Sequence, residues 1–254
     1  MPEQDIAISV KNLEKSFESL KVLEDINLDI CRGEIFVIMG GSGSGKSTLL
    51  RTMAGSIPPD SGQIFFGNKA LHDLGEEEKD VIKRRFGMSF QSAALLDSLT
   101  VEENVSLPLQ EHTSLTPNVI SIIAKMKLNL VGLQGFENYM PSMLSGGMRK
   151  RAGLARAIAM DPEIVFYDEP TAGLDPVMCA VIDRLILDLT RKLNLTSIVV
   201  THNMESVFRI ADRIAMLYRG KLLEVGTKQE IKNSKNEIVQ QFIKGKIEGP
   251  IQLT

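Results

Sequence analysis

The sequence predicts an α/β fold with a mostly parallel sheet. Two observations predict it: a glycine-rich loop at residues 40–48 follows an apolar run, and apolar runs alternate with helical patterns between residues 164 and 218. Strands that alternate with helices favour parallel βαβ units. We also expect an antiparallel β sub-domain near the N terminus and an inserted helical sub-domain at about residues 92–157.

The glycine-rich loop is the most specific motif. It fits G-x-x-x-x-G-K-[ST] and lies between the apolar residues 35–39 and Leu49, the strand–loop–helix context that the motif requires. Glycines let backbone N–H groups surround phosphates, and the following helix directs its positive end at the same anion. We therefore predict a P-loop NTPase (RecA-like) core that binds ATP through Gly40, Gly41, Ser42, Gly43, Ser44, Gly45, Lys46, Ser47 and Thr48. Lys46 is expected to contact the β- and γ-phosphates, and Ser47 to ligate Mg²⁺.

A second element is the apolar run 164–167, which stops at Asp168 and Glu169. A parallel strand buried on both faces has this pattern, and ligands bind beyond the carboxyl ends of such strands. We predict that Asp168 holds Mg²⁺ and that Glu169 polarises the attacking water. A strand that ends in a solvated acidic turn is the alternative.

A third element is the stretch Ser145, Gly146 and Gly147, which opens a long helical pattern. One hydroxyl and several free N–H groups at a helix start form an anion site that has no lysine of its own. This predicts half of a phosphate site. A serine N-cap with glycine spacers is the alternative.

The remaining elements follow in chain order. Strands at 6–10 and 22–30 are expected to form the antiparallel layer with 63–66, and the strand 86–90 leads into Gln91. A capping box at residues 100–103 and Pro117 begin helices of the helical sub-domain. The core continues with strands 164–167, 197–201 and 214–218, helices 176–193 and 203–210, and a hairpin turn at Arg219-Gly220. We expect an ATPase domain at residues 1–230 and a C-terminal helical extension at 231–254.

Composition limits the function classes. The chain has 29 basic and 32 acidic residues among 254, which gives a net charge of −3. The net charge therefore produces no positive electrostatic field that would favour binding of nucleic acid. No apolar run reaches the roughly 18 residues that span a bilayer, and residues 1–10 lack the pattern of a signal peptide. Cys31 and Cys179 are expected to be reduced, and the basic run 149–151 to lie on a solvated helix face.

With these motifs in this order, the chain resembles the ATP-binding subunit of ABC transporters along nearly its whole length. The resemblance implies an ATPase coupled to transport, with a Walker A loop at 40–48, a signature at 144–148 and a Walker B strand at 164–169. It further implies that Gln91 senses Mg²⁺ together with Ser47 and Asp168, and that Phe17 stacks on adenine. Catalytic roles fall to Lys46, Glu169 and His202. Ser145, Gly146, Gly147 and Asp175 are expected to contact ATP that is held by a second copy in a head-to-tail dimer.

Some of these residues have plain structural alternatives. An isolated glutamine is commonly a surface residue, an isolated phenylalanine belongs to a core, and a histidine after a strand neighbours an N-cap. The apolar residues 93–96, which follow Gln91, are expected to cradle a coupling helix of a membrane partner, with core packing as the alternative.

Within the family, residues 107–113, Met148 in place of the usual glutamine, and the tail 241–250 look like the ATPase of MCE-linked phospholipid transporters. This implies phospholipid cargo and a peripheral position on the cytoplasmic face of the bacterial inner membrane. The implied partners are an inner-membrane permease, an MCE-family protein and a small accessory subunit, with no nucleic acid. The alternatives are a lipoprotein exporter, a small-solute importer or a non-transport ATPase that acts on nucleic acid or ribosomes.

Overall fold

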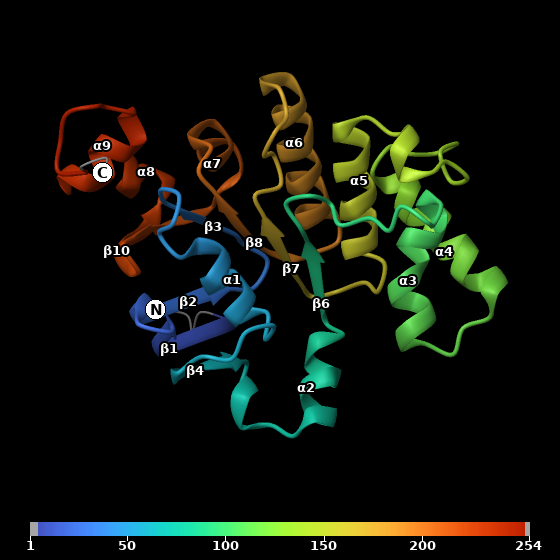
Figure 1. Cartoon of the computed structure of the whole chain (residues 1–254), viewed down its shortest axis with the longest axis horizontal. Helices are drawn as coiled ribbons and strands as arrows, with labels where there is room; N and C mark the ends of the chain where they lie inside the picture. The colour runs from blue at the N-terminus through green and yellow to red at the C-terminus, as the bar shows by residue number, and fades with distance from the viewer. Residues whose placement is uncertain (1–4, 252–254) are drawn as a thin grey trace. The chain divides into compact units, whose positions relative to one another are not determined.

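The computed structural model describes residues 5–251 (Figure 1). Residues 1–4, which begin the predicted ATPase domain, and 252–254, which end the predicted C-terminal extension, lie outside the described residues. The chain divides into two compact units. The first unit comprises residues 1–79 and 198–254, and the second comprises residues 80–197.

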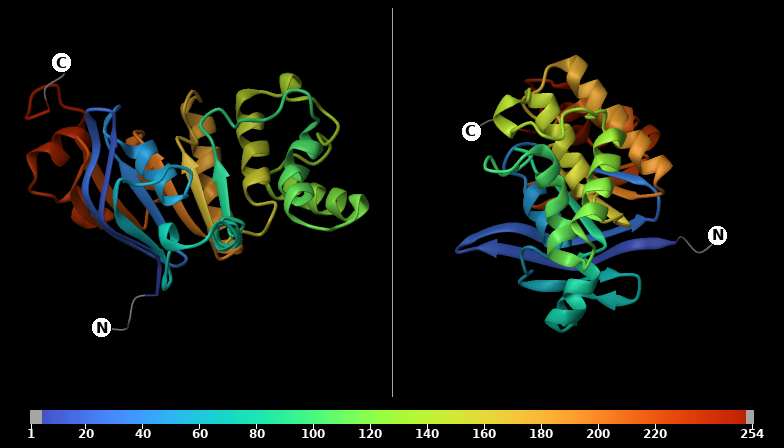
Figure 2. Two further views of the ribbon diagram at one scale, coloured as in Figure 1. Left: turned by 60° about the horizontal axis from the view of Figure 1, so that its bottom comes forward. Right: turned by 90° about the vertical axis from the view of Figure 1, so that its right-hand side faces the viewer.

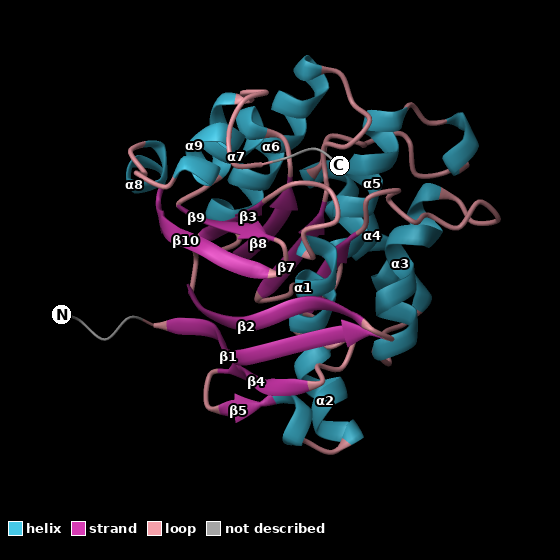
Figure 3. Ribbon diagram, turned by 60° about the vertical axis from the view of Figure 1, so that its left-hand side comes forward, coloured by secondary structure: helices cyan, strands magenta, loops and turns pink. Residues whose placement is uncertain are grey.

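The first unit contains an antiparallel sheet (Figure 3) with the order β2-β1-β4-β5. Its strands are β1 (Ile6–Phe17), β2 (Leu20–Cys31), β4 (Ser61–Phe66) and β5 (Lys69–Ala70). The predicted antiparallel layer is confirmed, but β1 and β2 are longer than expected. Polar residues interrupt the alternation, and the strands absorb them through irregularities in register, one of them at Asn12 with φ 48°.

The first unit also holds strands of a second, six-stranded sheet, in the order β10-β9-β3-β8. Here β3 (Ile35–Met39) pairs in parallel with β9 (Arg213–Tyr218), which forms an antiparallel hairpin with β10 (Lys221–Thr227). The predicted turn at Arg219 and Gly220 is confirmed, and both residues have positive φ. Strand β8 (Thr196–Thr201) begins at the division between the units. Helix α1 (Lys46–Met53) contacts β2, and α7 (Met204–Ile210) contacts β3.

The chain after β10 forms α8 (Lys228–Lys232) and α9 (Glu237–Lys244). Beyond α9, the residues up to Ile251 are held by the buried side chain of Gln241. Its Nε2 donates to the carbonyls of Lys246 and Ile251, both at 3.2 Å, and its Oε1 accepts from Ile251 N at 2.7 Å. Among the residues described up to Ile251, the last helix of this region ends at Lys244.

The second unit pairs β6 (Phe86–Ser89) in parallel with β7 (Ile164–Asp168). Helices α3 (Val101–His112), α4 (Pro117–Leu130) and α5 (Gly146–Ala157) pack against one another (Figure 2). The capping box at Thr100 is confirmed, and Pro117 opens α4. The limits of the helical sub-domain, 92–157, stay a prediction.

Further helices complete the chain: α6 (Pro176–Lys192) belongs to the second unit, and α2 (Glu76–Lys83) crosses the division near residue 79. Short 3-10 turns occur at η1 (Leu71–Asp73) and η2 (Pro141–Met143). Among residues 5–251, none of the helices combines the length and apolar character that crossing a bilayer requires.

Candidate nucleotide site

The glycine-rich loop connects the fully buried strand β3 to helix α1 in the first unit. Glycine is required at both ends of this loop for different reasons. At Gly40, a Cβ atom would lie 2.2 Å from the carbonyl oxygen of Leu217. At Gly45, φ is +102° and a Cβ atom would lie 2.8 Å from the carbonyl oxygen of Val22. Neighbouring backbone therefore fixes the loop, and side chains are excluded from its base.

The tip of the loop is open. No atom lies within 4 Å of the position that a Cβ would take at Gly41 or Gly43, and Ser42 is exposed. Lys46 is 7% exposed, and its Nζ donates to the carbonyl of Gly41 at 2.9 Å. The ammonium group therefore lies against the loop that its own helix follows. Ser47 and Thr48, both half-buried, lie with Lys46 in the first turn of α1, where the backbone N–H groups of a helix face an anion.

Phe17 lies at the end of β1 and is 46% exposed, so its ring is not part of the core. It pairs with Leu20 across the hairpin, and β2 then brings Val22 to the contact with Gly45. Lys15 lies over the ring at 5.5 Å from its centroid. The hairpin therefore presents an exposed aromatic ring that is free of the core, and its stacking on adenine stays a prediction.

His202 follows β8, the neighbour of β3 in the sheet, and is exposed. The next residue, Asn203, caps α7 through its side chain, which accepts from Ser206 N at 3.1 Å. His202 therefore lies next to an N-cap residue, which is the structural alternative given for it in the sequence analysis. Its role with the γ-phosphate stays a prediction.

In the second unit, Gln91 follows β6, Asp168 is the last residue of the neighbouring parallel strand β7, and Glu169 follows it. Because Ser89 pairs with Tyr167, the three residues leave the sheet at the same edge. Asp168 is 2% exposed and Glu169 is 8% exposed, whereas Gln91 is exposed. Glu169 has φ +47°, a left-handed conformation that turns the chain sharply away from β7.

Lys150 corrects one expectation. The basic run 149–151 was expected on a solvated face, and Arg149 is exposed, but Lys150 is only 8% exposed. Its ammonium donates to the carbonyl of Gln91 and to that of Glu169, the latter at 3.3 Å. Burial lowers the pKa of Lys150, while the nearby carboxylates of Glu169 and Asp168 act in the opposite direction. Position 150 lies on the buried side of α5, where the backbone offers acceptors.

The signature residues begin α5. Ser145 is the N-cap, and its Oγ accepts from Met148 N at 3.3 Å, so the capping alternative describes its local geometry. Ser145 and Gly146 are exposed, and Gly147 lies against the side chain of Met178. The hydroxyl keeps its proton available for an outside acceptor.

Asp175 has a structural task as well. Its carboxylate caps α6 by accepting from Val177 N and Met178 N, both at 3.0 Å. The residue is exposed, and its predicted contact with nucleotide in a second copy stays a prediction.

The residues predicted to hold Mg²⁺ carry oxygen donors of the kind that this ion binds together with a nucleotide, and the Mg²⁺ site itself stays a prediction. Within residues 5–251, no three His, Cys, Asp or Glu side chains gather in a way that could hold a metal alone. Mg²⁺ keeps several waters and binds one or two carboxylates together with substrate phosphates. The hydroxyl of Ser47, the carboxylate of Asp168 and the amide oxygen of Gln91 are oxygen donors of that kind.

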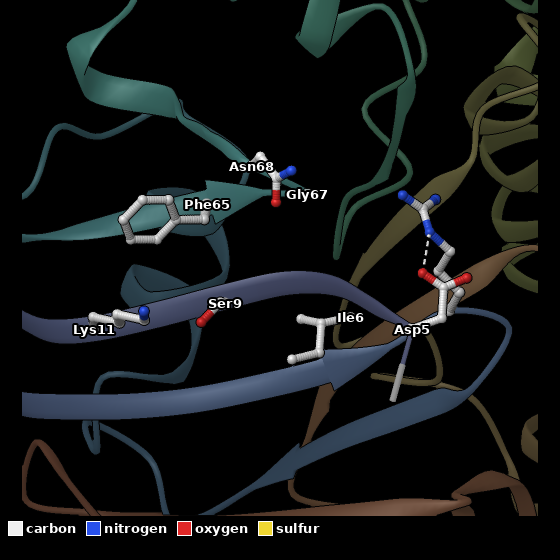
Figure 4. A pocket seen from close by; sticks show the side chains of 8 residues that line it. Asp5, Ile6, Ser9, Lys11, Phe65, Gly67 and Asn68 are labelled. Carbon is white, nitrogen blue, oxygen red and sulfur yellow. Dashed lines mark hydrogen bonds and ion pairs between the residues drawn. The ribbon is translucent and has the colours of Figure 1, made fainter. Parts of the chain in front are cut away.

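A separate hollow lies on the antiparallel sheet (Figure 4). It is lined by Ser9, Lys11 and Phe65, with the Asp5–Arg32 ion pair at one end, 3.0 Å between Oδ1 and Nε. Lys11 lies over the Phe65 ring at 5.1 Å from its centroid. None of the predicted site residues lines this hollow.

Sequence reasoning missed three side chains that organise the second unit around Gln91: Asn104, Lys150 and Arg156. A signal existed for Lys150. It shares the helix face of Gly147 and Leu154, both buried, at spacings of three and four residues. A lysine on such a face needs acceptors, but the sequence does not identify them.

The comparisons with known proteins agree with these observations. Residues 23–172 match the family model described as ABC transporter. The chain is similar to the intermembrane phospholipid transport system ATP-binding protein MlaF of Haemophilus influenzae, with 43% identity over 245 residues that cover 96% of this chain and 93% of the relative. It is also similar to the probable ribonucleotide transport ATP-binding protein of Mycobacterium leprae, with 41% identity over 98% of this chain and 72% of the relative.

Among solved structures, the chain is similar to a dimeric ATP-binding cassette in a post-hydrolysis state bound to ADP and Pi. The TM-score is 0.79 at 33% sequence identity, and the match covers 87% of this chain and 98% of the other. The predicted α/β nucleotide-binding fold is thereby confirmed.

Proposed function

The chain belongs to the ABC transporter family, and from this premise we propose that it is the ATP-hydrolysing subunit of a phospholipid transporter. The observation that carries the proposal is the phosphate loop. Its base is closed by the backbone of Leu217 and Val22, its tip is open, and Lys46 is folded against it. Such a loop binds the phosphates of ATP through backbone N–H groups and one ammonium.

In this proposal Lys46 moves from the carbonyl of Gly41 to the β- and γ-phosphates, and Ser47 takes part in holding Mg²⁺ with Asp168 and Gln91. When bound, Mg²⁺ neutralises charge on the phosphate oxygens. Glu169 orients the attacking water and accepts its proton. His202 donates a hydrogen bond toward the γ-phosphate, and Phe17 stacks on adenine.

We further propose that two copies act as a head-to-tail dimer. The solved cassette that the chain resembles is dimeric, and Ser145 and Gly146 form an exposed helix start. Ser145, Gly146, Gly147 and Asp175 of one copy would contact the nucleotide of the other, so hydrolysis would depend on pairing.

The transported cargo is proposed from the similarity to MlaF, whose name states intermembrane phospholipid transport. In this proposal the chain works on the cytoplasmic face of a bacterial inner membrane with a permease, an MCE-family protein and a small accessory subunit. Residues 93–96 contribute to the contact with the permease. Only part of that stretch is available, since Ala93 is buried and Leu96 is 49% exposed. A small-solute importer is not favoured, although the name of the mycobacterial relative states ribonucleotide transport.

Glu169→Gln tests the proposed chemistry. The variant keeps the shape of the side chain and loses the base, so we expect ATP binding and ATP-dependent dimerisation to persist while turnover falls on the order of 100-fold or more. Steady-state phosphate release and sedimentation with and without ATP measure both quantities. Turnover at the wild-type rate would remove Glu169 from its role.

The cargo is tested by purifying the tagged full chain from its native membranes, as wild type and as Glu169→Gln. Mass spectrometry of the bound proteins and lipids is expected to find a permease, an MCE-family protein and enriched phospholipid. A permease of another class, without phospholipid enrichment, would contradict the cargo and leave the ATPase assignment intact.

A further inference from the structure

The segment that follows β6, residues 91–100, has neither helix nor strand and yet is tightly specified. Ala93 and Ala94 both have positive φ, at 63° and 47°. Residues with a Cβ rarely adopt this conformation, so surrounding contacts must determine it. The segment begins at Gln91, a proposed contact of the metal and water.

The carbonyl groups of this segment are bound by side chains of two helices. Arg156 of α5 donates to the carbonyls of Ala93 and Ala94 at 2.7 and 2.6 Å. Asn104 of α3, which is fully buried, donates to the carbonyls of Leu96, Leu99 and Thr100 at 3.0, 3.1 and 2.9 Å. Lys150 of α5 binds the carbonyl of Gln91. Backbone groups that would otherwise bond within an element are thus bound to side chains.

Close packing keeps α5 beside the segment. A Cβ atom at Gly153 would lie 3.1 Å from Cβ of Ala93 and 3.3 Å from its carbonyl oxygen. Gly153 lies between Lys150 and Arg156 on the same helix. The absence of a side chain there lets both cations reach the main chain.

Lys150 differs from Arg156 and Asn104 because it also reaches a second segment. Its ammonium donates to the carbonyl of Glu169, at 3.3 Å, in addition to that of Gln91. Glu169 is itself in a left-handed conformation, so its main chain also depends on contacts outside its strand. One ammonium group, with three N–H donors, therefore joins the main chain on either side of the β6–β7 edge.

We propose that Lys150 is a positioning residue for hydrolysis, fixing the main chain of Gln91 to that of Glu169 and tying both to the helix that begins at the signature Ser145. The inference rests on the proposed ATPase function and extends it. Contact of nucleotide with the signature is transmitted along one turn and a half of α5 to Lys150, and from there to the water-orienting carboxylate. A neutral, apolar side chain at this position would leave two carbonyls without this donor.

The proposal predicts a specific kinetic signature for Lys150→Met in the full chain. We expect kcat to fall about tenfold while KM for ATP stays within about twofold, because a misplaced base slows chemistry and Lys46 is unaffected. Lys192→Met, the same change at an exposed lysine of α6, is the matched control and is expected to match wild type. A kcat for Lys150→Met within twofold of wild type would overturn the proposal.

Two more variants separate positioning from folding. Lys150→Arg keeps the charge and the donors, and its kcat is expected to exceed that of Lys150→Met at least threefold. Equal kcat values for two folded proteins would contradict a role through donated hydrogen bonds. If Lys150→Met does not fold, Lys150→Gln replaces it, since its shorter amide can bind only one of the two carbonyls. A lower kcat with an unchanged KM for ATP would support the proposal, and an unchanged kcat would overturn it.

Amide hydrogen exchange gives a readout that does not depend on turnover. In Lys150→Met, we expect faster exchange in peptides covering residues 90–96 and 168–173 together, with no change in Lys192→Met. Protection retained in either peptide would overturn the link between the two segments. Wild-type protein without ATPase activity, or an active Glu169→Gln, would instead count against the proposed function, whatever the exchange shows.

Discussion

The phosphate loop and the edge of the sheet at Glu169 are positioned in different ways. The loop is fixed mainly by backbone approaching backbone, at Gly40 against Leu217 and at Gly45 against Val22. At the Glu169 edge, side chains from α3 and α5 bind carbonyl groups of residues 91–100 and of Glu169 itself. The conformation of the loop therefore depends on the absence of side chains at its glycines. The conformation of the Glu169 edge depends on hydrogen-bond donors from residues that are distant in sequence.

This difference predicts which changes affect binding and which affect stability or turnover. In the loop, the glycines make room and Lys46 supplies the charge. Around Gln91, a side chain lost from α3 or α5 removes hydrogen bonds from partly buried carbonyls, and a carbonyl left without another donor costs more than the net value of the hydrogen bond.

The largest effect is expected for Lys46→Ala. Loss of the ammonium removes a charge-assisted contact with phosphate, so ATP affinity should fall about 100-fold or more, on the order of 3 kcal/mol. Titration with a fluorescent ATP analogue measures it, and the exposed Lys235→Ala provides the control. An ATP affinity near that of wild type would refute the assignment of residues 40–48 as the phosphate loop. The contrast between this loop and the Glu169 edge would then no longer hold.

A smaller effect, on stability, is expected for Asn104→Ala. The variant loses the donor to three carbonyls and the acceptor for Leu96 N, so the free energy of unfolding should fall by about 2–3 kcal/mol. Chemical denaturation followed by circular dichroism measures the loss, with the exposed Asn129→Ala alongside. If ATP affinity fell as much as stability, the two regions would not be positioned independently.

The smallest effect comes from a matched pair in the loop, Gly45→Ala and Gly43→Ala. Both positions have positive φ, but a Cβ meets the carbonyl of Val22 only at Gly45 and open space at Gly43. We expect Gly45→Ala to lower the free energy of unfolding by about 1 kcal/mol more than Gly43→Ala. The difference between the two variants reports the cost of the contact between the Cβ and the Val22 carbonyl, because positive φ is common to both positions. Equal losses in thermal unfolding would show that the contact with Val22 relaxes freely.

The same contrast explains what could be predicted from the sequence. The loop could be identified from the sequence because all the residues that the motif requires are consecutive, from Gly40 to Ser47. The acids were identifiable because an apolar strand ends at Asp168. Lys150 was assigned to solvent, since a basic run on a helix is normally hydrated and nothing near it in the sequence reveals the acceptors at Gln91 and Glu169.

Element boundaries failed for a related reason. Strand β1 extends well past the predicted residues 6–10, and β2 slightly past 22–30, because bulges let polar positions such as Asn12 enter the sheet. Residues 92–100, the first part of the predicted helical sub-domain, contain no helix. They are irregular because Asn104 and Arg156, which lie later in the chain, bind their carbonyls.

The left-handed turn at Glu169 has a consequence for attempts to improve the protein in the laboratory. Holding a residue with a Cβ in that conformation costs roughly 1 kcal/mol, and glycine would relieve it. If Glu169 has the role proposed for it, directed evolution for heat resistance alone would favour Glu169→Gly and select stable variants that no longer hydrolyse ATP. On that proposal, the left-handed conformation of Glu169 is a stability cost that is retained for catalysis.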